Sequence, residues 1–227
     1  MKKIIYALVF ATSFVFASCP YCLKEHSAIE HMNLHSHHAH KHHKHHGKAA
    51  RQPTSQLILD LMHGAMMKTA FVESKDVEKD FLANMIPHHQ GAIDSSKELL
   101  KHTKNETLKQ IANNIIKAQE AEIKEFSDIL NKKDYKQTKI SDKDYEKFVT
   151  DEKAIMHRMM SSMHSVKPSS DIDKDFLKAM IEHHQGAVDV SKQILEYSKD
   201  EKVREIASRI IKDQEKEIKD FQELLQK

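Results

Sequence analysis

An internal repeat constrains the fold of this chain more than any other sequence feature. Residues 79–126 align with residues 174–221 at a constant offset and without a gap, and well over half of the aligned positions are identical. The distance between the copies exceeds the roughly 20 to 50 residues of a solenoid repeat. Two copies of one larger structural unit therefore explain the sequence better than a stacked array does.

Each copy has the apolar spacing of α-helices. Over residues 81–100, and again over 108–130, apolar residues recur every three or four positions while Lys and Glu fill the opposite faces. Shorter helices are expected before them, near residues 55–70 and 143–164. With only 4 Gly and 4 Pro, the chain lacks the turn residues of a many-stranded β fold. We therefore predict an all-α helical bundle of two repeated three-helix units, whose four long helices have approximate twofold symmetry.

The charge balance argues against one class of partner. Lys and Arg number 36 and Asp and Glu 34, which leaves a net charge of +2 and no field strong enough to indicate a nucleic-acid partner. The unusual counts are 18 His and 11 Met, and these two residue types carry the metal hypothesis below.

The first residues have the pattern of an export signal. Lys2 and Lys3 precede an apolar run over residues 4–16, and a stretch suited to signal-peptide cleavage follows. The run is too short to cross a bilayer comfortably, so we expect no membrane span in the mature chain. A lipid anchor on Cys19 is a second interpretation, although Phe16 is a poor first residue for a lipoprotein box. Either way, we expect a periplasmic or cell-envelope location.

These features divide the chain into four expected segments. A signal peptide takes residues 1–18, and a Cys/His-rich flexible segment takes residues 19–50. The first helical repeat covers residues 51–135, and the second covers residues 136–227.

Each copy places a Met one helical turn before a His–His pair. Thioether sulfur suits Cu(I), whereas imidazole accepts copper in both oxidation states as well as zinc and nickel. A single helical Met is usually core packing, and a single His on an apolar face is usually hydrogen-bonded in the core. The repeated Met/His/His combination favours a metal site instead, with copper as the best candidate ion. The proposed ligands are Met85, His88, His89, Met180, His183 and His184.

The first helix of each copy adds further candidate ligands. Met and His alternate there within two turns, more densely than packing alone requires, although a Met-rich stripe could simply dock the helix on the bundle. The candidates are Met62, His63, Met66, Met156, His157, Met160, Met163 and His164.

Polar residues also interrupt the apolar stripe of the third helix. Buried polar groups need partners, so these residues could orient the histidines from a second shell or form a structural network between helices. Glu122 could also bind metal directly. The second-shell candidates are Gln119, Glu122, Gln214 and Glu217, with Asp94 and Asp189 in the same orienting role.

The segment before the repeats is dense in imidazole. Ten histidines fall between residues 26 and 46, which suits weak, exchangeable capture of borderline metals that protons oppose below about pH 6. The Cys19-x-x-Cys22 pair defaults to a disulfide in an exported protein, with a Cu(I) thiolate site as the alternative. The weaker metal candidates are Cys19, Cys22, His37, His38, His42, His43, His45 and His46.

The motif Phe-Leu-x-x-Met-Ile-Pro-His-His-Gln-Gly-Ala-Ile-Asp at residues 81–94, followed by Gln119 and Glu122, resembles the domain-of-unknown-function family 305. The resemblance covers roughly residues 55–226 in two copies. It implies an exported, ferritin-like helical protein, in a family that includes a periplasmic copper-binding resistance protein. It also implies ligands at the Met and His positions of the motif. Glu182 stands where the first copy has Pro87, which should kink or open the helix before its His pair.

We therefore expect an extracytoplasmic protein that binds copper, as Cu(I) or Cu(II), for sequestration or delivery and without catalysis. A metal-export or metal-delivery protein is a reasonable partner. A nickel or zinc buffer acting mainly through the His-rich segment is the first alternative, and a copper-dependent oxidase or a structural protein is less favoured. A di-iron oxidase needs inward Glu and Glu-x-x-His pairs, and neither copy has them.

Overall fold

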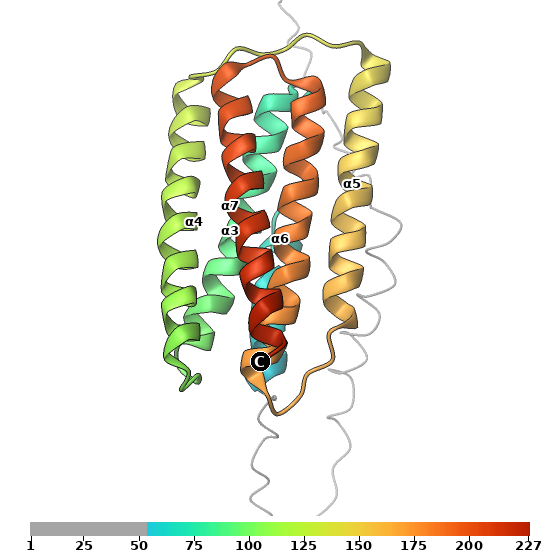
Figure 1. Ribbon diagram of the computed structural model, residues 1–227. Coiled ribbons are helices and arrows are strands. Elements are labelled where there is room, and N and C mark those ends of the chain that lie inside the picture. Colours follow the sequence, from blue (N-terminus) through green and yellow to red (C-terminus); the bar gives the residue numbers. More distant parts are fainter. Residues whose placement is uncertain (1–53) are drawn as a thin grey trace, which may run out of the picture. The chain divides into compact units, whose positions relative to one another are not determined.

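The computed structural model describes residues 54–227, which form six α-helices and, within that range, no strand (Figure 1). This confirms the all-α fold of two three-helix units. The predictions for the signal peptide and the Cys/His-rich segment lie outside the described residues. The helices are α2 (Thr54–Lys68), α3 (Val77–Leu99), α4 (Glu106–Lys132), α5 (Asp142–Ser165), α6 (Ile172–Tyr197) and α7 (Glu201–Leu225).

Short polar caps determine where the helices begin. The side chain of Asp76 accepts a hydrogen bond from the backbone N–H of Lys79, and Asp171 does the same for Lys174 at the start of α6. Each cap satisfies one of the backbone donors that a helix N-terminus leaves without an intrahelical partner. The two copies therefore begin their second helices with the same Asp side-chain cap.

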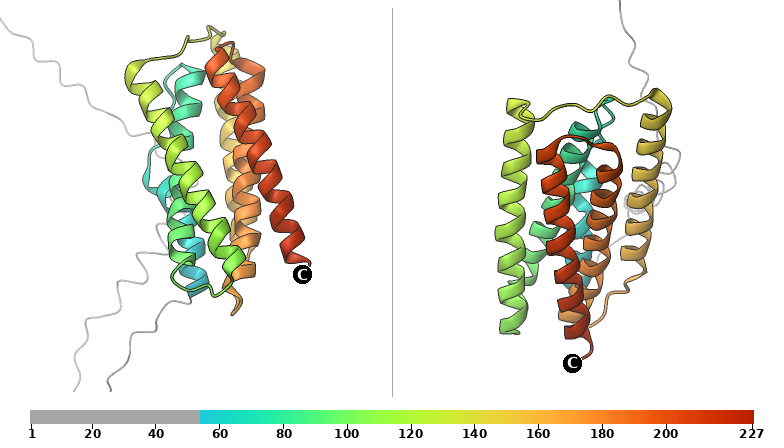
Figure 2. Two further views of the ribbon diagram at one scale, coloured as in Figure 1. Left: turned by 60° about the vertical axis from the view of Figure 1, so that its left-hand side comes forward. Right: turned by 45° about the horizontal axis from the view of Figure 1, so that its top comes forward.

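The long helices form two hairpins. α3 packs on α4 and α6 packs on α7, while α2 covers α3 and α5 covers α6 (Figures 1 and 2). α3 and α6 also pack against each other, and the Ser198 hydroxyl donates to Glu78 Oε1 over 2.6 Å. Because Glu78 begins α3 and Ser198 ends α6, the two central helices run antiparallel. A pseudo-twofold axis therefore passes between them.

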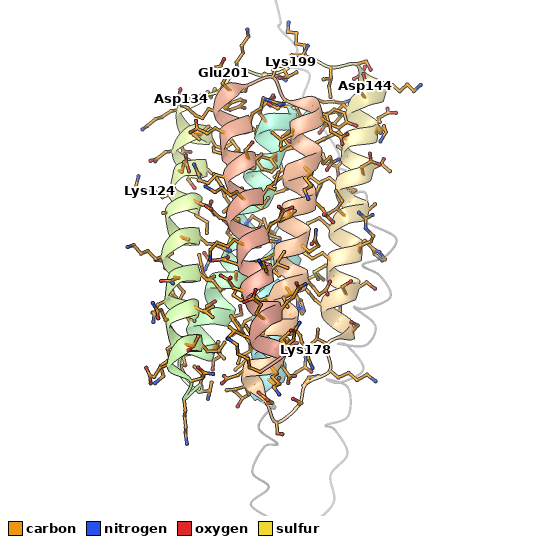
Figure 3. All side chains as sticks on the ribbon, viewed as in Figure 1. Lys124, Asp134, Asp144, Lys178, Lys199 and Glu201 are labelled. Carbon is orange, nitrogen blue, oxygen red and sulfur yellow. The ribbon has the colours of Figure 1, made fainter. Side chains whose placement is uncertain are left out.

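Repeated aromatic residues fill the core. Phe81 and Phe126 of the first copy are fully buried, and so are their counterparts Phe176 and Phe221. Most charged residues lie on the outer faces, where Lys124 of α4 is exposed (Figure 3). No helix among residues 54–227 has the length and apolar character needed to cross a membrane.

Two local expectations were wrong. The range expected for α5, residues 143–164, agrees with Asp142–Ser165 to within one residue at each end, but α5 is not shorter than the bundle helices, since its 24 residues match the 25 of α7. Pro87 was expected to open its helix, yet α3 is one continuous helix that includes it. A proline costs one intrahelical hydrogen bond, and the packing of α3 against α2, α4 and α6 outweighs that loss.

Candidate metal centre

His88 of α3 and His183 of α6 meet on the pseudo-twofold axis. Their ring centroids lie 3.8 Å apart with the ring planes inclined by 33°, and the two residues are 2% and 0% exposed. They occupy equivalent positions in the two copies, so the repeat brings the same residue to the axis twice. The structure thus joins two of the predicted ligands across the repeats.

The ring nitrogens of this pair have no hydrogen-bond partners. Nδ1 and Nε2 of both His88 and His183 are buried and unpaired. Each ring also lies near the backbone of the other histidine, but the contact does not have the geometry of a hydrogen bond. This contact raises the pKa of each ring by less than burial lowers it. Burial, together with the neighbouring imidazoles, holds the pKa of both rings well below the usual value of 6.5. Both rings are therefore neutral, which is the form that binds metal.

The second histidine of each motif has a different environment. His89 Nε2 lies 2.8 Å from Glu122 Oε2, and His184 Nε2 lies 2.7 Å from Glu217 Oε2. Both carboxylates come from the third helix of their own copy, as the sequence suggested for a second shell. Because these bonds occupy Nε2, only the buried Nδ1 atoms of His89 and His184 remain without a partner. The better-placed donors are therefore His88 and His183.

Thioether sulfur lies close along the chain on both sides. Met85 and Met180 each precede a central histidine by one turn and are 3% and 0% exposed. Among residues 54–227, no three side chains of the His, Cys, Asp or Glu type come close enough together to hold one ion. A metal site on the axis must therefore combine the two imidazoles with thioether donors, or use few protein ligands.

The remaining second-shell candidates separate into two groups. Gln119 and Gln214 are buried, and their side-chain Oε1 atoms have no partner, so they remain available near the histidine–carboxylate pairs. Asp94 was expected to orient a histidine, but it accepts a 2.7 Å hydrogen bond from Gln90 Nε2. Asp189 likewise accepts from Gln185 one turn away, so the short reach of an aspartate favours its own helix over a neighbour.

The Met/His clusters of the first helices form a second, more exposed group. His63 of α2 and His164 of α5 have ring centroids 4.9 Å apart. With the buried Met163, they line a pocket of about 230 Å³ between the two helices. Met62 is fully buried, Met66 is half-buried and His157 is exposed. The structure thus unites three of these candidates and leaves His157 on the outer face.

The buried stripe of α5 differs from the predicted one. The i, i+4, i+7 spacing of Met156, Met160 and Met163 predicts that the three share the inner face, but Met156 and Met160 are only half-buried. Met159 takes the inner position and is 4% exposed. Periodicity did not separate Met159 from Met160, because adjacent methionines fit a helical stripe equally well.

Two glycines show which methionines of α2 and α5 pack against the central helices. A Cβ at Gly91 would lie 1.9 Å from the backbone oxygen of Met62, so α2 approaches α3 at backbone distance. A Cβ at Gly186 would instead lie 2.4 Å from Sδ of Met159. By packing, Met159 is thus the counterpart of Met62, and its thioether occupies the space beside the turn that carries His183.

Solved structures of known proteins share similarity with this chain. CopM in its silver-bound form is 27% identical, with a TM-score of 0.50 over 66% of this chain and 94% of that one. CopM in its Cu(II)-bound form is 25% identical over 66% and 96% of the chains, with a TM-score of 0.49. A putative secreted DUF305 protein from Streptomyces coelicolor is 22% identical over 66% and 91%, with a TM-score of 0.52.

The sequence relatives place the chain in one family. An uncharacterized protein, L153, of Acanthamoeba polyphaga mimivirus is 39% identical over 69 residues, which are 30% of this chain. The chain covers 43% of that relative's length. The family described as domain of unknown function (DUF305) matches residues 23–130 and again residues 78–225. The chain therefore belongs to the DUF305 family, as a member with two tandem copies of the motif.

Proposed function

We propose that this protein binds a soft or borderline metal ion, with copper the best candidate, at the His88–His183 pair between α3 and α6. The observation that carries the proposal is the set of four imidazole nitrogens buried on the axis without partners. An unpaired buried polar group costs about 1 to 3 kcal/mol. Each neutral ring has one lone pair and one N–H, so a bound cation that accepts the lone pair of each ring would remove that part of the cost.

The donor chemistry supports copper over harder ions. Two neutral imidazoles meet on the axis, and a buried thioether precedes each of them by one helical turn, whereas the carboxylates of Glu122 and Glu217 bond to His89 and His184. Mg²⁺ and Ca²⁺ need several oxygen ligands, which this interior does not offer. The silver-bound form of CopM supports the same class, because Ag(I), like Cu(I), is a soft ion that favours sulfur and nitrogen donors.

The biological role we propose is sequestration or delivery of copper outside the cytoplasm, for copper tolerance. The apolar run at residues 4–16 is the basis for export, and a metal-export or metal-delivery protein would be the natural partner. We propose binding without turnover, because the central pair is closed off from solvent on all sides and offers no room for an organic substrate.

A second candidate function rests on a separate observation. Ten histidines between residues 26 and 46 suit a nickel or zinc buffer that works mainly through that segment. It predicts that removing those imidazoles abolishes binding, whereas changing the bundle histidines has little effect.

The deciding experiment uses the full chain with the ten N-terminal histidines changed to Asn and both cysteines to Ser. Cu(I) binding is measured by anaerobic competition with bicinchoninate. This parent should remove Cu(I) from the chelator, and the double variant His88→Leu/His183→Leu should not. His102→Leu, at an exposed position that pairs with Glu98, is the matched control and should bind like the parent. Equal binding by the double variant and the parent would refute the axial site.

A further inference from the structure

The two copies connect the buried histidines to the surface in the same way. Each histidine–carboxylate pair has one end fully buried and the other near solvent. The side chains of His89 and His184 are 0% exposed, whereas those of their partners Glu122 and Glu217 are 15% and 30% exposed. Each carboxylate therefore lies between solvent and the imidazole next to the axial pair.

The two carboxylates differ in what covers them. Arg209 of α7 reaches across to α4, where its Nε lies 3.7 Å from Glu122 Oε1 and its Nη2 also bonds to Glu125. The equivalent position in the first copy is Asn114, a neutral residue, so Glu217 has no corresponding guanidinium. Burial alone would raise the pKa of Glu122, but His89 and Arg209 outweigh it and lower that pKa. The first copy thus has a neutralised, covered carboxylate where the second has an uncovered one.

The surface grooves agree with this difference. A pocket of about 340 Å³ between α4 and α7 has Asn114 and Glu217 in its wall, so it reaches the carboxylate that bonds to His184. Its charged lining comprises Glu217, Asp220 and Glu223 with Lys216 and Lys227, and the ammonium of Lys216 pairs with Asp220. The corresponding pocket near Arg209 has Arg209 and Glu125 in its wall, but Glu122 does not line it. The guanidinium therefore separates that groove from the buried pair.

Resting on the proposed function, we propose that the metal ion enters and leaves through the Glu217 groove, and that Arg209 closes the equivalent route at Glu122. A carboxylate in a groove of low-dielectric walls attracts cations, whereas a carboxylate beside a guanidinium exerts almost no net field. From Glu217 the route continues along His184, whose ring centroid lies 6.2 Å from that of His183. The metal ion thus reaches His88 and His183 from the Glu217 side alone.

The repeat supplies a reciprocal test. Asn114→Arg gives the open side the residue that closes the other, and Arg209→Asn gives the closed side the residue of the open one. The double variant exchanges the two sides. All variants are made in the chain with the N-terminal histidines and cysteines replaced, and helix content is checked by circular dichroism. The probe is Cu(I), supplied as the bicinchoninate complex, and stopped-flow absorbance gives the association and dissociation rates.

Asn114→Arg should slow association by about tenfold or more, within the range that electrostatic steering spans, and should slow dissociation alongside it. Arg209→Asn should leave uptake as fast or faster, and the double variant should regain the parent's rates through the Glu122 side. Unchanged rates in Asn114→Arg would overturn the route and point instead to entry between α2 and α5, past His63 and His164. A parent that binds no Cu(I) would refute the proposed function itself. That outcome differs from slowed rates and from unchanged rates in Asn114→Arg, because both of those require a parent that binds the ion.

Discussion

Replacing the axial histidines by leucine should make the metal-free protein more stable. His88 and His183 bury four unpaired ring nitrogens, and each neutral ring has one N–H donor and one acceptor. An unsatisfied buried group costs about 1 to 3 kcal/mol, so counting only one group per ring gives a gain of about 2 to 6 kcal/mol for His88→Leu/His183→Leu. Leucine fills a similar volume and suits a helix, so packing and helix propensity add little opposing cost.

Metal should stabilise the parent and leave the leucine variant unchanged. A ligand that binds only the folded state adds about 2.7 kcal/mol when its free concentration is one hundred times its dissociation constant. The parent should therefore gain about that much free energy of unfolding on addition of Cu(I), and the double leucine variant should gain none. The assay is urea unfolding followed by circular dichroism, with the metal-free arm run in excess chelator.

The reasoning fails if the metal-free leucine variant is less stable than the metal-free parent while keeping its fold. That result would mean that the imidazole nitrogens are satisfied in solution, for example by buried water. The axial pair would then be an ordinary buried polar cluster, and its lack of partners would no longer indicate a ligand.

Three other substitutions test separate parts of the structure. Gly91→Ala should destabilise the fold by about 3 kcal/mol or more in urea unfolding, because the new Cβ meets the Met62 backbone. Gly186→Ala should cost only about 1 kcal/mol, because only the flexible Met159 side chain has to move. Equal losses would show that α2 and α5 pack alike. Glu152 is buried, and its pKa is raised to about 8, mainly by burial, so the folded state holds a proton that the unfolded chain releases above its ordinary pKa of 4.5. Stability should therefore fall as pH rises from 4.5 to 8, by roughly 3 to 5 kcal/mol, and Glu152→Gln should flatten this slope when unfolding is measured across that range. The Tyr145 hydroxyl donates to Asp80 over 2.5 Å in a buried pair, so Tyr145→Phe should cost about 1 to 2 kcal/mol, and no loss would show that Ser74 alone satisfies the carboxylate.

The fold could be predicted from the sequence because the repeat and the helical periodicity agree at every level. The two copies have matching apolar patterns and matching caps at Asp76 and Asp171, so both are expected to form the same helices and to pack with approximate twofold symmetry. The bounds of α5 were also predicted to within one residue at each end, although its N-terminal half buries Tyr145 and Phe148 between charged residues.

The candidate site was only half predictable. The motif identified both histidines of each pair, but not which of them has unpaired nitrogens. That depends on Glu122 and Glu217 reaching across from neighbouring helices, 33 residues away along the chain. The meeting of His88 with His183 depends on how α3 crosses α6, and local periodicity carries no information about that crossing.

Fusing two copies in one chain lets the halves diverge everywhere except on the axis. Arg209 faces Asn114 in the alignment, and Met159 takes the packing position of Met62, so the surroundings of the site are asymmetric. The axial pair is the part of the proposed site to which both copies contribute, so losing either imidazole would remove one of its two central ligands. His88→Leu and His183→Leu should therefore each abolish Cu(I) binding to the same extent in the chelator assay. If one single variant binds normally, the ion is held within one repeat, and the axis does not form the site.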